Sequence, residues 1–90
     1  MLQFVSKYSI IKEKEGDKML KVKANGLKIA ETRIRMGLLG SDLAKAIGVT
    51  KQTIYTIERG EINPGPAVAK AISEKLGVTF DELFTIEEGE

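Results

Sequence analysis

Alternating hydrophobic residues mark the first part of the chain as a β-region. Residues 2–10 and 19–24 each alternate between apolar and polar positions, which is typical of strands. In the first stretch Leu2, Phe4, Tyr8 and Ile10 share one parity, with Ser6 between them. Gly16 and Asp17, between the two stretches, favour a turn because glycine accepts positive φ and aspartate bonds its own backbone. The pattern predicts an N-terminal β-hairpin.

Apolar residues then recur at helical spacing. The pattern predicts helices over about 26–36, 41–47, 51–58 and 66–76, and a short one after residue 79. Asn25, Thr50 and Thr79 suit the N-cap position, where a side-chain oxygen accepts a free N–H, and Pro66 suits a first turn. The predicted fold is mainly α, with a hairpin extension over 1–24 as a candidate dimerisation element. A helical domain over 25–86 and an acidic tail over 87–90 follow.

The segment 40–59 has the features of two short helices that cross at a steep angle. Such a crossing needs a small residue where the backbones approach, and Ala44 supplies it. The turn needs a left-handed residue, and Gly48 supplies it. Apolar residues must fill the angle, and these are Leu43, Ile47, Val49, Ile54 and Ile57. Because all of these requirements are met together, the segment predicts a helix-turn-helix.

The outward face of the predicted helix over 51–58 is rich in hydrogen-bonding groups. On a helical wheel Ile54 and Ile57 face the core with Thr53, and the outward residues are Lys51, Gln52, Tyr55, Thr56 and Arg59. Lysine can donate to guanine and glutamine can pair with adenine in the major groove. We therefore expect base contacts from Lys51, Gln52 and Thr56, and contacts to the DNA backbone from Tyr55 and Arg59.

The charge distribution is consistent with a nucleic-acid partner. Residues 1–26 carry six lysines against three acids, and residues 27–60 carry six basic residues against three acids. Residues 61–90 carry two lysines against seven acids. The first two-thirds of the chain can therefore attract phosphate while the acidic end points away.

The composition leaves little for catalysis. The chain has no histidine and no cysteine, so the commonest general base, metal ligands and disulfides are missing. We expect no enzyme, no cofactor and no metal. The N-terminal residues lack the pattern of a signal peptide, and no stretch is apolar enough to cross a bilayer. The expected location is the cytoplasm.

Six short motifs between residues 43 and 84 resemble those of a known family. The motifs are LA at 43–44, IGVTKQTI at 47–54, IERG at 57–60, NP at 63–64, LGV at 76–78 and DELF at 81–84. They are similar to those of the Cro/C1-type (Xre-like) helix-turn-helix family, over about residues 25–84. The resemblance implies a compact five-helix domain whose third helix enters the major groove, and a structural pair between Arg33 and Glu58.

The chain departs from the family at the start of the second helix. Leu39 and Gly40 stand where the family has a threonine or serine cap and a phosphate-binding glutamine. Gly40 still offers a backbone N–H at a helix N-terminus, and Ser41 is a substitute donor. The full set of expected backbone-contacting residues is Gly40, Ser41, Thr53, Tyr55 and Arg59.

Two functions compete on the sequence. The leading one is a sequence-specific double-stranded-DNA-binding regulator of a bacterium or phage, a repressor that acts as a homodimer on a palindromic operator. The alternative is an antitoxin-like or other protein-interaction module, in which DNA binding is secondary and residues 2–24 hold a protein partner. The sequence gives neither the operator nor the inducing signal.

Overall fold

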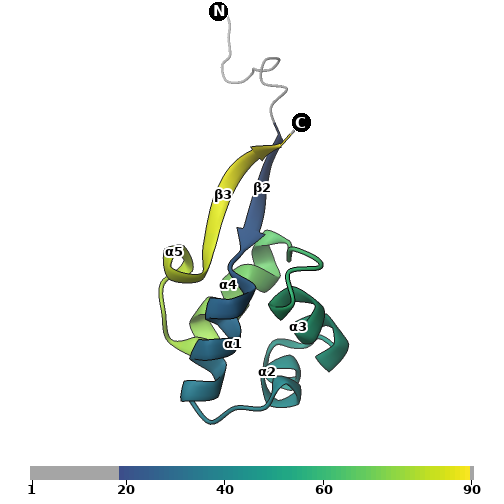
Figure 1. Ribbon diagram of the computed structural model, residues 1–90, viewed down its shortest axis with the longest axis vertical. Helices are drawn as coiled ribbons and strands as arrows, with labels where there is room; N and C mark the ends of the chain where they lie inside the picture. Colours follow the sequence, from purple (N-terminus) through teal and green to yellow (C-terminus); the bar gives the residue numbers. More distant parts are fainter. Residues whose placement is uncertain (1–18, 90) are drawn as a thin grey trace, which may run out of the picture.

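The computed structural model describes residues 19–89 of the chain. In this part, helices form a body and two strands form a ribbon that projects from it, which we call the arm (Figure 1). The helices are α1 (Gly26–Arg35), α2 (Gly40–Ile47), α3 (Lys51–Glu58), α4 (Pro66–Leu76) and α5 (Phe80–Leu83). The arm consists of β2 (Met19–Ala24) and β3 (Phe84–Gly89). The predicted mainly helical fold is confirmed, and no helix of residues 19–89 is long and apolar enough to span a membrane.

The arm is an antiparallel pair with one apolar face. Val22 lies opposite Ile86 and Ala24 lies opposite Phe84, and residues opposite each other project to the same side of a ladder. Val22 and Phe84 are buried and join the core at the base of the arm. Leu20 and Ile86 are 68% and 62% exposed. The arm is therefore anchored at its base and offers an apolar surface farther out.

The second predicted strand has a partner that the sequence analysis did not expect. Residues 19–24 do form a strand, but in the described part of the chain they pair with 84–89, a segment predicted to end a helix and begin the acidic tail 87–90. The alternation in Phe84, Thr85 and Ile86 is cut short by two glutamates, so only pairing with a distant strand makes this segment extended. The predicted strand over 2–10 and its turn lie outside the described residues.

Local capping explains where α1 and α3 begin and where α2 ends. The side chain of Asn25 accepts the backbone N–H of Lys28 at 3.1 Å, and the hydroxyl of Thr50 accepts that of Thr53 at 3.2 Å. Gly48 has φ of +81° and ends α2, so the chain turns at once toward α3. These positions confirm the predicted caps at Asn25 and Thr50 and the predicted turn at Gly48. Thr79 is the N-cap of α5, but its hydroxyl donates to Glu82 and makes no cap hydrogen bond to the helix backbone.

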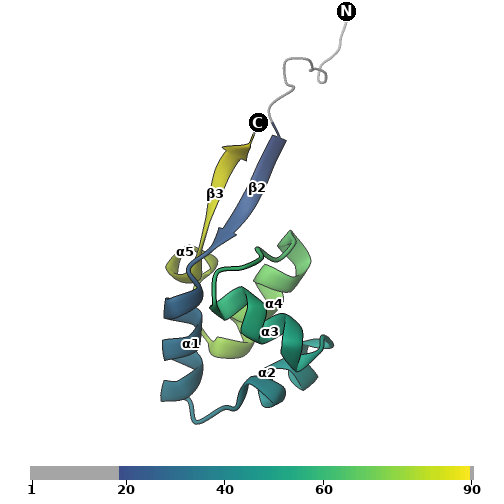
Figure 2. The same ribbon diagram turned by 45° about the vertical axis from the view of Figure 1, so that its right-hand side comes forward.

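The hydrophobic core gathers side chains from all five helices and the arm. In the view of Figure 2 the helices lie below the arm. The largest fully buried members of the core are Phe84, Ile29, Leu43, Ile54, Ile57, Ile72 and Leu83. Two of these isoleucines belong to α3, and truncation of one to alanine costs about 2–5 kcal/mol. The core thus fixes α3 through the face opposite to its polar one.

The N-terminus of α1 packs directly on the C-terminus of α3. A Cβ added to Gly26 would lie 2.4 Å from the carbonyl oxygen of Glu58 and 2.5 Å from that of Ile57. Real carbon atoms do not approach so closely, so only glycine permits this contact. The contact holds the end of α3 against α1.

Candidate nucleic-acid interface

The polar face of α3 lies on the surface. Lys51 and Gln52 are exposed in the first turn, whereas Ile54 and Ile57 are buried below them. Because the first turn of α3 directly follows the tight turn after α2, these two side chains stand at the outer corner of the helix-turn-helix. Both keep their hydrogen-bonding groups available to a ligand that approaches this corner.

Thr56 is half-buried, and its hydroxyl is used within the helix. It donates to the carbonyl oxygens of Gln52 and Thr53, at 3.0 and 2.9 Å. Its hydrogen is therefore committed to the backbone, and what remains for a base edge is the methyl group and a lone pair. This side chain is therefore better suited to an apolar contact with the C5-methyl of thymine than to a hydrogen bond with a base.

Thr53 is half-buried beside the cap of α3. Its hydroxyl lies 3.0 Å from that of Thr50, and its N–H donates to the same cap oxygen. One of the two hydroxyls donates to the other, so this pair of hydroxyls supplies one further hydrogen to a ligand at the start of α3.

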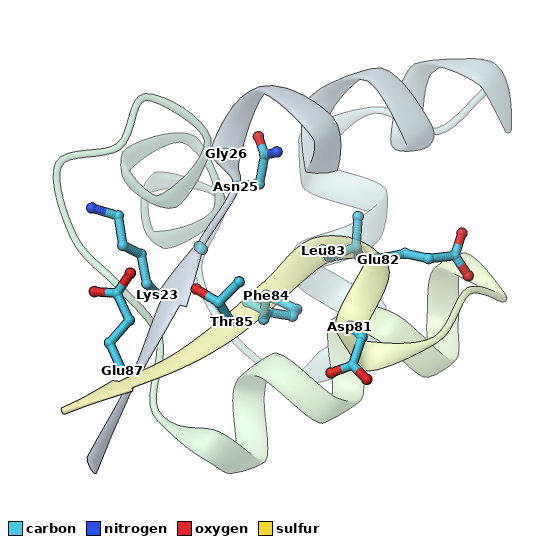
Figure 3. Close-up of a pocket in the computed structure, with 10 residues that line it drawn as sticks. Lys23, Asn25, Gly26, Asp81, Glu82, Leu83, Phe84, Thr85 and Glu87 are labelled. Carbon is cyan, nitrogen blue, oxygen red and sulfur yellow. The ribbon is translucent and has the colours of Figure 1, made fainter. Parts of the chain in front are cut away.

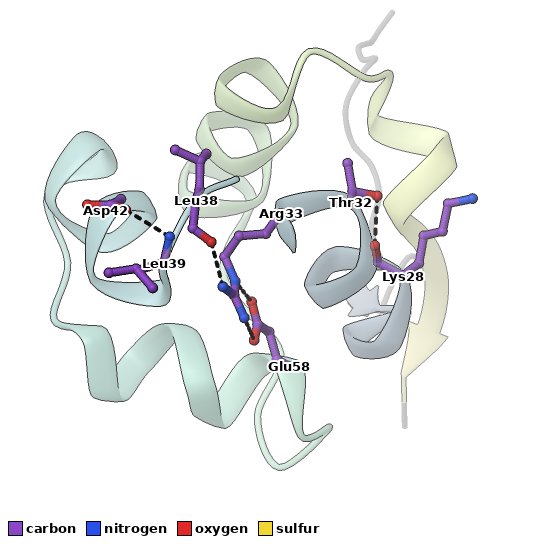
Figure 4. Close-up of polar contacts among 7 residues, drawn as sticks. All are labelled: Lys28, Thr32, Arg33, Leu38, Leu39, Asp42 and Glu58. Atoms are coloured by element: carbon purple, nitrogen blue, oxygen red, sulfur yellow. Dashed lines mark hydrogen bonds and ion pairs between the residues drawn. The ribbon is translucent and has the colours of Figure 1, made fainter. Parts of the chain in front are cut away.

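Arg33 of α1 and Glu58 of α3 form a bidentate ion pair inside the body (Figure 4). Nε and Nη2 of Arg33 donate to the two carboxylate oxygens at 2.7 and 3.0 Å, and Nη1 donates to the carbonyl oxygen of Leu38 at 2.7 Å. The hydrogen bond to Glu58 raises the pKa of Arg33 further above its ordinary value. The pair joins α1, α3 and the segment before α2.

The start of α2 is capped from within its own first turn. The carboxylate of Asp42 accepts the backbone N–H of Leu39 at 2.8 Å (Figure 4). Ser41 is exposed at this end of the helix, where first-turn N–H groups have no intrahelical acceptor. The aspartate thus binds the N–H of Leu39, which is a different donor from the first-turn N–H groups that a serine or threonine at position 39 would accept. Ser41 keeps its hydroxyl on the surface.

Gly40 is buried by the ring of Tyr55, a contact that the sequence patterns did not indicate. A Cβ on Gly40 would lie 2.5 Å from Cζ and 2.7 Å from Oη of that ring. Tyr55 is half-buried, and the guanidinium carbon of Arg33 lies 5.9 Å from its ring centroid, within the range of a cation–π contact. The only signal in the sequence was a glycine at a helix start, where no turn requires one.

Arg59 is tied to an acidic neighbour that sequence reasoning did not link to it. Nε and Nη2 of Arg59 donate to Glu61 at 2.9 and 3.3 Å, and both side chains are exposed. The hydrogen bond raises the pKa of Arg59 and lowers the pKa of Glu61. A phosphate that binds Arg59 must therefore compete with this carboxylate or displace it.

A surface hollow of about 390 Å³ lies at the base of the arm, away from the predicted site residues (Figure 3). Its lining residues include Lys23, Asp81, Glu82 and Glu87, and no residue of α3 lines it. Three carboxylates against one ammonium repel phosphate. The hollow is therefore separate from the candidate interface on α2 and α3.

Comparison with known proteins points to one family. The family model HTH_3, described as helix-turn-helix, matches residues 29–83, which is more than half of the chain. An uncharacterized HTH-type transcriptional regulator from Methanothermobacter thermautotrophicus is 40% identical over 48 residues, which make up 53% of this chain and 70% of that protein.

Solved structures agree in fold. The master regulator for biofilm formation SinR, in complex with DNA, is 32% identical with a TM-score of 0.59, over 62% of this chain and 90% of that one. The clp gene regulator ClgR from Corynebacterium glutamicum is 21% identical with a TM-score of 0.61, over 63% of this chain. The aligned part spans 61% of ClgR, and this likeness concerns the fold alone.

Proposed function

Because the chain belongs to the HTH_3 helix-turn-helix family, we propose that it binds a specific sequence of double-stranded DNA and regulates transcription. In this proposal it is a small bacterial or phage repressor that acts in the cytoplasm. The observation that carries the proposal is the exposed first turn of α3, with Lys51 and Gln52 on a helix whose opposite face is held in the core. A rigid helix with free donors at its N-terminal end suits the major groove.

Base recognition is assigned to three residues. Lys51 donates to guanine O6 and N7, and Gln52 bonds adenine N6 and N7 together. Thr56 presents its methyl group to a thymine, because its hydroxyl hydrogen is taken by the helix backbone. Each good contact contributes about 1–3 kcal/mol of discrimination against the wrong base.

Contacts to the DNA backbone are assigned to the rim of the same surface. The exposed hydroxyl of Ser41 is at the N-terminus of α2, where the helix dipole favours phosphate, and the N–H of the buried Gly40 belongs to the same helix end. Tyr55 and Thr53 offer hydroxyls, and Arg59 offers its guanidinium once it leaves Glu61. These contacts orient α3 and carry no sequence information themselves.

A homodimer on a palindromic operator completes the proposal. One recognition helix reads too few base pairs for selectivity in a genome, and two-fold dimers solve this with half-sites one helical turn apart. The arm is the candidate interface, because Leu20 and Ile86 are exposed beside a groove of about 390 Å³ that Pro64 and Pro66 help to line. An isolated two-stranded ribbon is only marginally stable in water, so a partner would also stabilise it.

Selection from a pool of random duplexes tests this function. The wild-type chain should enrich one motif, and the Lys51→Ala/Gln52→Ala variant should lose or change it. Lys45→Ala is the matched control, since it removes an exposed lysine from α2 and should enrich the same motif. If the wild-type chain enriches no motif, the proposed function is wrong.

A further inference from the structure

The ring of Tyr55 packs against the backbone of Gly40, and this contact requires a residue without a side chain at position 40. Gly40 is the first residue of α2, and a Cβ there would lie 2.5, 2.6 and 2.7 Å from Cζ, Cε1 and Oη of Tyr55. Contacts shorter than 3.0 Å are essentially never made by real Cβ atoms. The ring therefore occupies the space that any other residue at position 40 would need.

Arg33 also holds the ring of Tyr55 in place. The guanidinium of Arg33 lies 5.9 Å from the ring centroid, and that guanidinium is itself fixed by Glu58 and by the carbonyl oxygen of Leu38. Tyr55 cannot swing away from Gly40 without leaving this buried group. One side chain of α3 thus contacts the start of α2 and lies beside the ion pair that joins α3 to α1.

We propose that Tyr55 is a positioning residue for DNA recognition. Its ring, seated on Gly40, sets the angle between α2 and α3. That angle decides where Lys51 and Gln52 meet the bases when the start of α2 rests on the DNA backbone. The effect on recognition rests on the proposed function, whereas the coupling between positions 40 and 55 does not. The role belongs to the ring, and it is distinct from a phosphate contact by the hydroxyl.

A stability cycle tests the coupling. Alanine normally favours a helix over glycine, so Gly40→Ala should be stabilising or neutral wherever there is room. We expect Gly40→Ala to lower the urea midpoint in the wild-type background and to leave it unchanged or raise it in the Tyr55→Ala background. Gly65→Ala is the control: nothing lies within 4 Å of a Cβ at this N-cap, so its effect on the midpoint, whatever its sign, should be the same in both backgrounds. If Gly40→Ala has the same effect in both backgrounds, the coupling does not exist.

DNA discrimination tests the positioning. The readout is the ratio of affinities for the selected and a scrambled duplex. Tyr55→Phe keeps the ring, so it should lower the affinities for both duplexes by the same factor and leave their ratio unchanged. Tyr55→Ala and Gly40→Ala should lower the ratio at least about tenfold, which corresponds to about 1.4 kcal/mol. Circular dichroism shows whether each variant is folded, and Tyr55→Leu replaces Tyr55→Ala if that variant unfolds.

The outcomes separate this inference from the proposed function. If Tyr55→Phe lowers the ratio as much as Tyr55→Ala, the hydroxyl acts directly and the positioning role is wrong. If wild type discriminates and Tyr55→Ala discriminates equally well, the positioning role is again wrong while the proposed function stands. If the wild-type chain itself does not discriminate, the proposed function and the positioning role both fail, and the stability cycle still decides the coupling.

Discussion

Arg33 and Glu58 are joined by two charge-assisted hydrogen bonds of 2.7 and 3.0 Å, with side chains only 10% and 7% exposed. They lie 25 positions apart in the sequence and connect α1 to the end of α3. Since water reaches neither group freely, each charge depends on the other for its solvation. The pair therefore holds α3 at its C-terminal end, where Gly26 also packs against it.

Removal of one partner should destabilise the protein strongly. We expect Glu58→Gln or Arg33→Met to lower the free energy of unfolding by about 3–5 kcal/mol, because the remaining charge or donors stay buried without a full partner. Urea denaturation followed by circular dichroism measures this loss. The control is Glu31→Ala, which breaks the pair with Arg35 whose side chains are 76% and 54% exposed, and should cost less than about 1 kcal/mol. Equal losses in both pairs would contradict the account.

The sequence predicted the helices well because their signals are local. Asn25, Thr50 and Pro66 stand at the starts of helices, and Gly48 and Gly77 at their ends, and each acts through a few neighbouring residues. The spacing of apolar residues over 40–59 likewise predicted that α2 and α3 cross. The core face of α3 follows from the same spacing, because Ile54 and Ile57 are three positions apart on one helix.

Two of the features that the sequence did not predict depend on contacts between distant residues, and a third depends on local rotamers. Strand β3 exists because Phe84 and Ile86 meet β2 about sixty positions earlier, and no local pattern announces that pairing. The contact between Tyr55 and Gly40 joins two helices, and its only signal in the sequence is a glycine that no turn requires. The link between Arg59 and Glu61 is local but depends on rotamers at the end of α3.

Glu61 should restrain DNA binding. Its carboxylate holds the guanidinium of Arg59 and adds a negative charge beside the proposed phosphate contacts. We expect Glu61→Gln to raise affinity for all duplexes about three- to tenfold near physiological salt, and to steepen the salt dependence by about one phosphate contact. Fluorescence anisotropy over a salt series measures both. Glu74→Gln removes the same charge from α4 and should change affinity less, and equal effects of the two variants would refute a special role of Glu61.

The arm should mediate self-association. We expect Leu20→Ser combined with Ile86→Ser to convert a dimer to a monomer in sedimentation equilibrium, because two exposed apolar side chains of one face are lost. The helical body should keep its circular dichroism. Leu27→Ser is the matched control, since Leu27 is 81% exposed on α1 and lies outside the arm. A wild-type chain that sediments as a monomer, or a double variant that still dimerises, would exclude this interface.

Glu82 should contribute to the pH dependence of stability. The backbone N–H and the hydroxyl of Thr79 donate to its carboxylate, each at 3.0 Å, and these bonds hold its pKa below the ordinary 4.5. The ionised form is thus favoured in the folded state. Its contribution is complete above pH 4.5 and is lost as the pH falls through the lowered pKa.

Glu82→Gln should remove this contribution. The variant should be less stable than wild type at neutral pH, and the difference should shrink as the pH is lowered below 4.5. Urea midpoints of both proteins across the acid range measure it. A difference that stays constant, or that grows toward low pH, would show that the carboxylate is not stabilised by Thr79.

If the first turn of α3 reads bases, as we propose, its side chains set the preference for one duplex over another. Anisotropy titrations compare the selected duplex with its scrambled counterpart at two salt concentrations, for wild type, Lys51→Ala and Gln52→Ala. We predict at least about 1000-fold preference by wild type, affinities that fall with salt, and a loss of about 1–3 kcal/mol of discrimination in each variant. Equal binding of both duplexes by wild type, or undiminished discrimination in both variants, would contradict the claim.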